Sequence, residues 1–224
     1  MKLNNKSLIV TIAVLFSVPS QAQHYGYRNS SYHQTSSQYG ARNTPYIYYG
    51  FRLGINGSTV HSDDSRLDGG NTQSGVNIGA TMDIMLTPTT PLFFETGLEY
   101  TEKGGKGSNH GKNFTYGLNY LEVPLLLKYQ YKVDRDIAIT PFVGGYLAYG
   151  TGGKIKNLDD RVSTSAFSSE NFQRFDGGLR VGCGTMLGLF YVEVGYDAGL
   201  TNISNDTFDS SHTGSLFANI GINF

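Results

Sequence analysis

The sequence is poor in the residues that hold many exported proteins together. Its 224 residues contain one cysteine, Cys183, and no tryptophan. A lone cysteine cannot form an internal disulfide, which excludes a disulfide-stapled scaffold. No apolar run after the N-terminal region approaches the roughly 20 residues that a transmembrane helix needs. A net charge of −1 gives no electrostatic argument for nucleic acid or strongly anionic partners.

The first 22 residues have the pattern of a secretory signal peptide. Lys2 and Lys6 precede an apolar stretch over residues 8–18, and Ser20-Gln21-Ala22 suits cleavage. A buried N-terminal helix is the alternative. Residues 23–44 are rich in Tyr, Ser, Gln, Asn and His without hydrophobic periodicity, which predicts a disordered periplasmic leader. Residues 45–224 then form one domain.

That domain is rich in short alternating segments. The 29 glycines and 16 tyrosines favour an all-β fold. In the terminal segment 215–224, apolar side chains such as Leu216 and Ile220 alternate with small or polar ones such as Asn219. A soluble sandwich strand can alternate in this way, and so can a strand of a membrane barrel. Comparable runs cover residues 46–59, 74–86, 91–103, 114–131, 137–151, 172–186 and 189–203.

The connections between these runs alternate in length. Residues 87–90, 132–136 and 187–188 are short links, whereas 61–73, 104–113, 152–171 and 202–213 are longer and polar. Bacterial outer-membrane barrels have short periplasmic turns and longer extracellular loops. The sequence therefore predicts an eight-stranded antiparallel transmembrane β-barrel with up-and-down topology. We expect a monomer in the bacterial outer membrane, with both termini in the periplasm.

The two faces of the predicted strands differ in charge. An Arg or Lys facing lipid at mid-bilayer costs about 2–4 kcal/mol, and the central outward positions carry no charge on this register. The inward positions form a predicted charge network of Arg52, Asp83, Glu95, Glu99, Glu122, Lys128, Asp176, Arg180, Glu193 and Asp197. With eight strands the lumen is filled by side chains, so we interpret the network as structural. A proton or ion path is the alternative.

Several further features of the strands are predicted. Inward glycines make room for the rings of Tyr48, Phe142 and Tyr146. Pro124 and Pro141 each remove a ladder donor, so we expect bulges or local breaks beside them. The alternation also slips before Tyr120, which suggests a bulge or loop. Outward aromatic residues gather near the strand ends, as in an interfacial girdle: Tyr49, Phe94, Tyr129, Tyr131, Phe190 and Phe224 at one end, and Tyr100 and Tyr149 at the other.

The segment Tyr120-Leu-Glu-Val-Pro-Leu-Leu-Leu-Lys-Tyr129 resembles PorT-like outer-membrane barrel proteins of Bacteroidota. Looser similarity extends over residues 46–224, at Tyr100–Gly104, Pro141–Tyr146, Phe175–Leu179, Tyr196–Ile203 and Asn219–Phe224. The resemblance implies an outer-membrane location. It also implies insertion by the barrel-assembly machinery, which reads the last strand ending at Phe224. The namesake of the family belongs to a protein secretion and gliding system. The family supplies no catalytic residues.

Candidate chemistry is confined to polar loops. His61, Ser62, Asp63 and Asp64 lie in one loop and Ser210, Ser211 and His212 in another, where a lipid hydrolase would place its catalytic groups. The alternative is that these Ser, Asp and His residues are simply solvated in polar loops. Gly104–Ser108 lacks the spacing of a phosphate-binding loop and reads as a hairpin loop. We interpret Cys183 as an inert, lipid-facing thiol. Asp159 and Asp160 are candidates for calcium or for divalent bridges to lipopolysaccharide, against a merely solvated loop.

We therefore predict no catalytic, cofactor or metal site. The expected function is that of a structural or interaction protein acting through its extracellular loops. A narrow porin, an accessory of protein secretion and an outer-membrane lipid hydrolase are the alternatives. The expected partners are outer-membrane lipid and lipopolysaccharide, the barrel-assembly machinery and secretion or envelope proteins, and nucleic acid is not among them.

Overall fold

The computed structural model describes residues 47–62, 69–109, 112–157, 163–167, 172–203 and 211–224. The chain divides into two compact units, residues 1–42 and 43–224, and all described residues belong to the second. The predicted signal peptide (1–22) and leader (23–44) lie outside the described residues. None of the helices searched within these ranges is long and apolar enough to cross a membrane.

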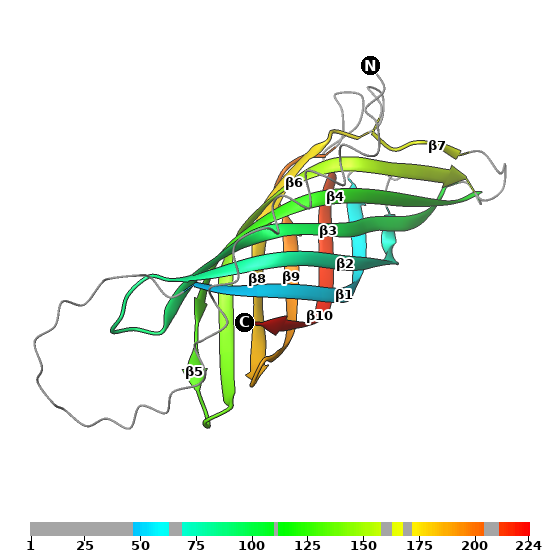
Figure 1. The fold of residues 1–224 in the computed structure, drawn as a ribbon. Coiled ribbons are helices and arrows are strands. Elements are labelled where there is room, and N and C mark those ends of the chain that lie inside the picture. The colour runs from blue at the N-terminus through cyan, green and yellow to red at the C-terminus, as the bar shows by residue number, and fades with distance from the viewer. Residues whose placement is uncertain (1–46, 63–68, 110–111, 158–162, 168–171, 204–210) are drawn as a thin grey trace, which may run out of the picture. The chain divides into compact units, whose positions relative to one another are not determined.

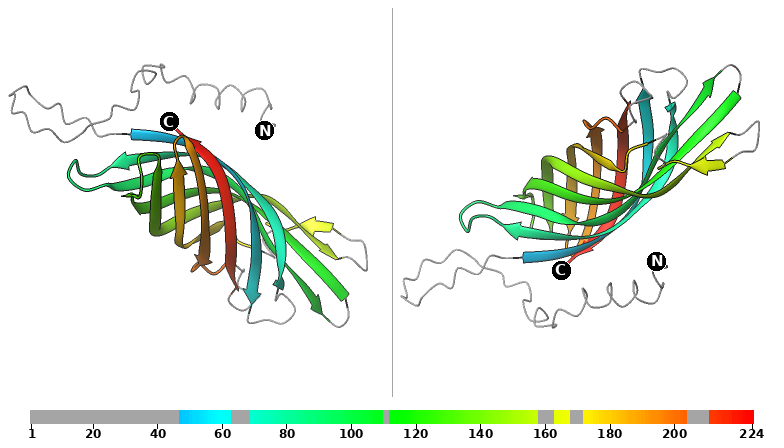
Figure 2. Two further views of the ribbon diagram at one scale, coloured as in Figure 1. Left: turned by 90° about the horizontal axis from the view of Figure 1, so that it is seen from below. Right: turned by 90° about the horizontal axis from the view of Figure 1, so that it is seen from above.

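The described residues form one antiparallel sheet that closes on itself. Its long strands are β1 (Ile47–Ser62), β2 (Gly69–Met85), β3 (Leu92–Asn109), β4 (Lys112–Tyr129), β6 (Ile137–Asn157), β8 (Phe175–Leu187), β9 (Phe190–Gly199) and β10 (Ser211–Asn223). Each pairs with the next, and β10 returns to pair with β1. Figures 1 and 2 show β10 beside β1 and β4 beside β6. The predicted eight-stranded up-and-down barrel is confirmed.

Two short strands complete the sheet. β5 (Tyr131–Lys132) and β7 (Ser163–Ser165) each pair with β6. β5 continues the register of β4 after an interruption that faces Pro141. The β3–β4 ladder likewise omits the pair that would join Gly97 to Pro124, with the same register on both sides. Because proline has no N–H to donate, both gaps are the predicted local breaks.

The irregularity that we expected near Tyr120 has its origin in the partner strand. The β4–β6 register shifts between Asn119 and Tyr120, where Thr151 is the extra residue of β6. On β4 itself the alternation continues, since Leu118, Tyr120 and Glu122 are all buried. The apparent slip arose because the inward positions change there from charged to apolar. The bulge reverses the faces of β6, so that Ile155 packs inward.

The long strands extend further than the sequence indicated. β3 and β4 run through the expected 104–113 loop and leave only residues 110–111 between them, and β6 continues to Asn157. The expected loops at 61–73 and 202–213 are also shortened, by β1, β2 and β10. Little in the sequence indicates these extensions, because their outward positions carry glycine or polar side chains instead of apolar ones. In Figure 1, β3, β4 and β6 reach furthest at this end of the barrel.

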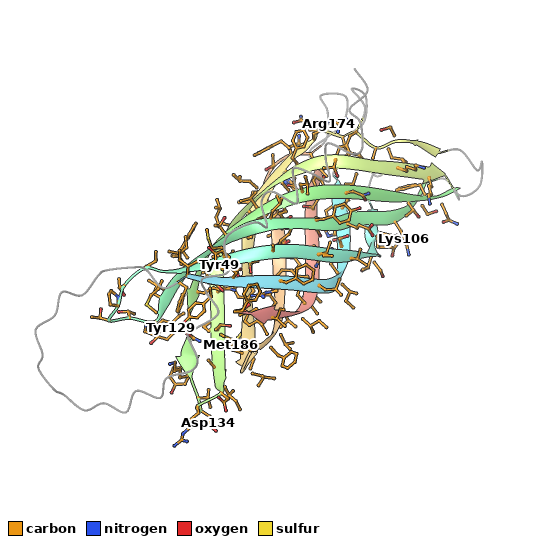
Figure 3. The ribbon with its side chains drawn as sticks, viewed as in Figure 1. Tyr49, Lys106, Tyr129, Asp134, Arg174 and Met186 are labelled. Carbon is orange, nitrogen blue, oxygen red and sulfur yellow. The ribbon has the colours of Figure 1, made fainter. Side chains whose placement is uncertain are left out.

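The opposite end of the barrel carries the short links, at 86–91, 133–136 and 188–189. Gly188 has a φ of 64°, a left-handed conformation that only glycine adopts without strain. Tyr49 and Phe224 exchange backbone hydrogen bonds of 2.9 Å at this end. Figure 3 shows Tyr49, Tyr129, Asp134 and Met186 here and Lys106 at the far end. The first and last described strands therefore begin and end beside the short turns.

The outer wall is apolar. The positions that face outward between the aromatic strand ends carry no charged side chain in any of the eight long strands as described. Most exposed aromatic residues lie toward the two ends, with Tyr129, Tyr131, Phe190 and Phe224 at the short-turn end and Tyr149 and Phe175 at the other. Tyr196 is an exception, because it is exposed beside Val181 at the middle of β8. This distribution suits a wall surrounded by hydrocarbon.

Candidate functional site

The lumen of the barrel is the candidate site, because its buried side chains are charged. All ten residues of the predicted charge network are buried there, with an eleventh, Lys103. Lys103 follows Glu99 and Thr101 on the same face of β3, so continuing the period of two would have found it. Within the described residues, the buried side chains include seven carboxylates and four cations. The lumen therefore has an excess of negative charge when all of these groups are ionised.

One charge cluster lies toward the short-turn end. Lys128 of β4 pairs with Glu95 of β3 and lies 3.6 Å from Asp83 of β2. Arg52 of β1 lies 3.7 Å from Glu95 and 4.0 Å from Glu193 of β9. These contacts connect five of the eight long strands across the lumen, which a structural lattice requires and an open channel would not contain.

Aromatic rings and amides fill the space around these charges. Both cations of this cluster lie over the ring of Tyr191, Arg52 at 4.1 Å and Lys128 at 4.7 Å from its centroid. Arg52 also donates a hydrogen bond of 2.6 Å to the side chain of Asn223. Cations over aromatic faces in a desolvated setting are stabilised by about 2 kcal/mol. The cluster is therefore packed as well as paired.

A second charge cluster lies nearer the extended end and centres on Arg180 of β8. Its guanidinium donates to Asp197 at 2.6 and 2.9 Å, to Glu99 at 2.8 Å and to Glu122 at shorter range. Lys103 lies 2.8 Å from Glu122 and 3.4 Å from Asp197. Four strands thus contribute to one buried ion-pair network.

Asp176 stands apart from the ion pairs of this second cluster. Its carboxylate accepts hydrogen bonds from the Thr213 hydroxyl at 2.9 Å and the Gly177 backbone N–H at 2.8 Å. It is fully buried near the start of β8, at the extended end of the barrel. Its role in the lumen is therefore that of a hydrogen-bond acceptor.

A layer of uncharged polar groups joins the two clusters. Asn56 donates to Asn77 at 2.7 Å and to Thr101 at 3.0 Å. Asn77 donates to Asn219 at 3.2 Å, which in turn donates to Glu193 at 2.9 Å. Sequence reasoning assigned no role to these amides. Through Asn219 they supply Glu193 of the first cluster with a donor, so this polar layer extends the hydrogen-bonded interior beyond the ion pairs.

Inward glycines admit the aromatic rings of the lumen. A Cβ on Gly182 would lie 2.4 Å from the Phe142 ring, and one on Gly184 would overlap Tyr191. This confirms the predicted role for Phe142. Tyr146 is also fully buried, whereas Tyr48 is 38% exposed at the rim, where its ring lies 5.8 Å from that of Phe93.

An apolar cluster, the outer plug, closes the lumen at the extended end. Its strand residues are Val60, Leu118, Tyr120, Tyr146 and Ala148, and its other members come from outside the long strands: Ala166, Phe167, Phe172 and Ile203. The rings of Tyr120 and Phe167 meet edge to face at 5.6 Å. The sequence predicted a lumen filled by side chains but not this apolar cluster, because its members lie far apart along the chain. Phe167 and Phe172, two phenylalanines in a serine-rich stretch, were the available indication.

The candidate hydrolase residues are placed on or near the β1–β10 seam. His61 of β1 is paired in register with His212 of β10. Ser211 is buried while its neighbour His212 is partly exposed, because adjacent strand residues face opposite sides. Asp63, Asp64 and Ser210 lie outside the described residues, as do Asp159 and Asp160. The described neighbours Ser211 and His212 therefore do not lie on one face of the sheet.

The remaining candidates lie in regular strands. Gly104–Ser108 belongs to β3, so the expectation of a hairpin loop there is wrong, and its backbone is used in the β3–β4 ladder. Cys183 is exposed on the outer wall. Among the described residues there is no group of three or more His, Cys, Asp or Glu side chains that could hold a metal ion.

Comparisons with known proteins agree with this architecture. The sequence model of the outer membrane protein beta-barrel domain family matches residues 21–205. Curated proteins give no significant match. Neisserial surface protein A has a similar structure, with a TM-score of 0.51 and 12% identity over 79% of this chain and 97% of that chain.

Two further solved structures are more distant. The attachment invasion locus protein of Yersinia pestis, solved with the heparin analogue sucrose octasulfate, gives a TM-score of 0.42 and 14% identity over 80% of this chain and 99% of its own. The N-terminal β-barrel domain of Pseudomonas aeruginosa OprF gives 0.38 and 12% over 78% and 97%. The family match covers most of the sequence, and the chain belongs to the outer membrane protein beta-barrel domain family.

Proposed function

We propose that this small outer-membrane barrel is a non-conducting structural or interaction protein, and that its working surface is the extended end of β3, β4 and β6. The observation that carries the proposal is the filled lumen, with two ion-pair clusters and an apolar outer plug. Such an interior gives solutes no path, so function is left to the outer surface. We propose that the chain is a monomer and not an enzyme.

The proposal includes the placement of the chain. Residues 1–22 direct export as a signal peptide, the short-turn end with both termini faces the periplasm, and the extended end faces outward. The short links at one end and the strand extensions of β3, β4 and β6 at the other support this orientation. A closer kinship with PorT-like proteins of Bacteroidota rests on the Tyr120–Tyr129 segment.

Planar-bilayer recording tests the closed lumen. The purified barrel should give no step conductance in molar KCl under conditions in which a porin inserts and conducts. The double variant Phe167→Ala/Phe172→Ala, which removes two rings of the outer plug, should also stay closed because the charge clusters lie beneath it. Regular conductance steps from the wild-type barrel would show a narrow porin instead.

Phe224 should matter more for assembly than for stability. It is 64% exposed and ends the strand that we propose the barrel-assembly machinery reads. Phe224→Ala should change the free energy of unfolding by less than about 1 kcal/mol, as for an ordinary surface substitution. Its yield in the outer membrane should fall several-fold. Leu189→Ala, at an exposed turn residue of the same end, is the control. Equal yields of both variants would remove the assembly role.

A further inference from the structure

The outer wall carries a group of lysines above the apolar band, on the extension of β3, β4 and β6. In register, Lys106 of β3 lies beside Thr115 of β4, which lies beside Lys156 of β6. Lys154 lies beside Gly117, which in turn faces Gly104. Leu118 of β4 is buried and faces the lumen, so Thr115 and Gly117, at odd-numbered positions of the same strand, face outward. The lysines paired with these two residues face outward as well. We call Lys106, Lys154 and Lys156 the lysine patch.

The lysine patch surrounds open space on the described part of the wall. Glu102 lies on the same outer face of β3, where it accepts a hydrogen bond of 3.2 Å from the Tyr100 hydroxyl. Side chains of all three lysines are exposed, and no carboxylate of a described residue pairs with them. A Cβ on Gly117 would meet nothing closer than 3.9 Å. Two strand spacings separate Lys106 from Lys156, or about 10 Å. Like charges held this close around an open floor favour a multivalent anion such as a phosphate group.

A groove lies lower on the same wall. Gly145 of β6 and Gly177 of β8 form its floor, and its walls are the side chains of Leu125, Leu147, Phe175 and Leu200. The chain after β9 stays beside β8, where the Leu200 N–H donates a hydrogen bond of 2.9 Å to the Gly177 carbonyl. The groove is a shallow hollow, widely open to its surroundings, with a volume of about 350 Å³. It is lined mainly by apolar side chains and opens on the face that meets hydrocarbon.

Strand β6 connects the groove to the lysine patch. Leu147 and Lys154 are separated by about 20 Å along the strand. A strand tilt of about 40° reduces this to a height of about 15 Å. One leaflet contributes about half of a hydrocarbon core that is about 30 Å thick. The spacing therefore matches a lipid whose acyl chain occupies the groove while its phosphate reaches the lysines.

We propose that this wall is a binding site for lipid A, the phosphorylated, multiply acylated glycolipid of the outer leaflet. The charge of the lysine patch complements its phosphates, and the groove accommodates one of its acyl chains. Phosphatidylethanolamine, whose ammonium offsets its phosphate, should bind less well. The inference rests on the proposed orientation with the extended end outside. Bilayer conductance and lipid binding are separate measurements, so either proposal can fail without the other.

Native mass spectrometry of the full-length mature barrel in neutral detergent tests the site. Lipid A carrying its phosphates should bind at least tenfold more tightly than dephosphorylated lipid A or phosphatidylethanolamine. Lys154→Gln/Lys156→Gln should weaken lipid A binding at least tenfold. The control Lys132→Gln/Arg135→Gln removes the same charge at the opposite end and should change binding less than twofold. Equal lipid A binding by both variants, or no effect of dephosphorylation, would overturn the proposal that the lysine patch binds the phosphates.

The groove is tested with a second pair of variants. Phe175→Ala/Leu200→Ala removes two of its walls and should weaken binding of fully acylated lipid A several-fold. The control Leu216→Ala/Ile220→Ala removes apolar side chains of similar size from the exposed face of β10 and should have little effect on lipid A binding. Heat-dependent gel mobility confirms that each variant is folded. A loss in the lysine variant without a loss in the groove variant would overturn the acyl-chain part of the proposal.

Discussion

Replacing Arg180 by methionine should lower the free energy of unfolding by about 3–5 kcal/mol, the usual cost of removing one partner of a buried ion pair. Arg180 contacts Glu99, Glu122 and Asp197 in a lumen where buried carboxylates already outnumber cations. Lys103 remains close to Glu122 and Asp197, but Glu99 loses the cation that it contacts. The variant therefore buries an uncompensated charge.

Urea titration of the barrel in phosphatidylcholine vesicles measures this loss, followed by circular dichroism and gel mobility. Lys132→Met, at an exposed lysine of β5, should change stability by less than about 0.5 kcal/mol. Adding Glu99→Gln to the Arg180→Met background should restore about 1 kcal/mol or more, because it neutralises the carboxylate that loses its cation. Wild-type stability in Arg180→Met would show that the interior is hydrated and the network is not structural.

Val181→Lys should destabilise the barrel by about 2–4 kcal/mol, although it adds a positive charge only one residue from Arg180. Val181 is 55% exposed at the middle of β8, on the outer wall. A cation there meets hydrocarbon and has no carboxylate to pair with. A positive charge at position 180 should therefore stabilise the barrel, and one at position 181 should destabilise it.

The same urea titration in lipid vesicles gives this value. Leu189→Lys is the matched control, because it introduces the same residue at the turn between β8 and β9, where the cost should fall to about 0–1 kcal/mol. Equal costs at the two positions would mean that the middle of the wall is not in hydrocarbon. That result would contradict the membrane assignment itself.

The strand faces could be predicted because lipid and lumen impose opposite demands on alternate residues. Leu179 and Val181 flank Arg180 in the sequence, and the structure places the leucine and valine outside and the arginine inside. Period two was sufficient to position each of these side chains. Lys103 was missed only because the expected strand was taken to end there.

The outer part of the barrel could not be read in the same way. Beyond Tyr100 and Tyr149 the outward positions carry glycine or polar side chains, so the extensions to Asn109 and Asn157 lack the apolar outward face that marks the rest of each strand. The outer plug brings Val60 together with Phe167 and Ile203, which are distant in the sequence. Nothing local in the chain indicates such contacts. The lysine patch likewise depends on how β3, β4 and β6 pair with one another. The register of that pairing is seen in the structure and not in the sequence.

The meeting of Arg52 with Asn223 and Glu193 has a consequence for how the chain inserts. These contacts join the first strand to the last two, so they form only when the cylinder is sealed. A slip of one residue at the β1–β10 seam would turn Asn219 and Asn223 into the hydrocarbon and leave Arg52 facing isoleucine. A slipped closure would therefore be less stable than the native one, so the interior polar groups favour the correct register when the barrel closes.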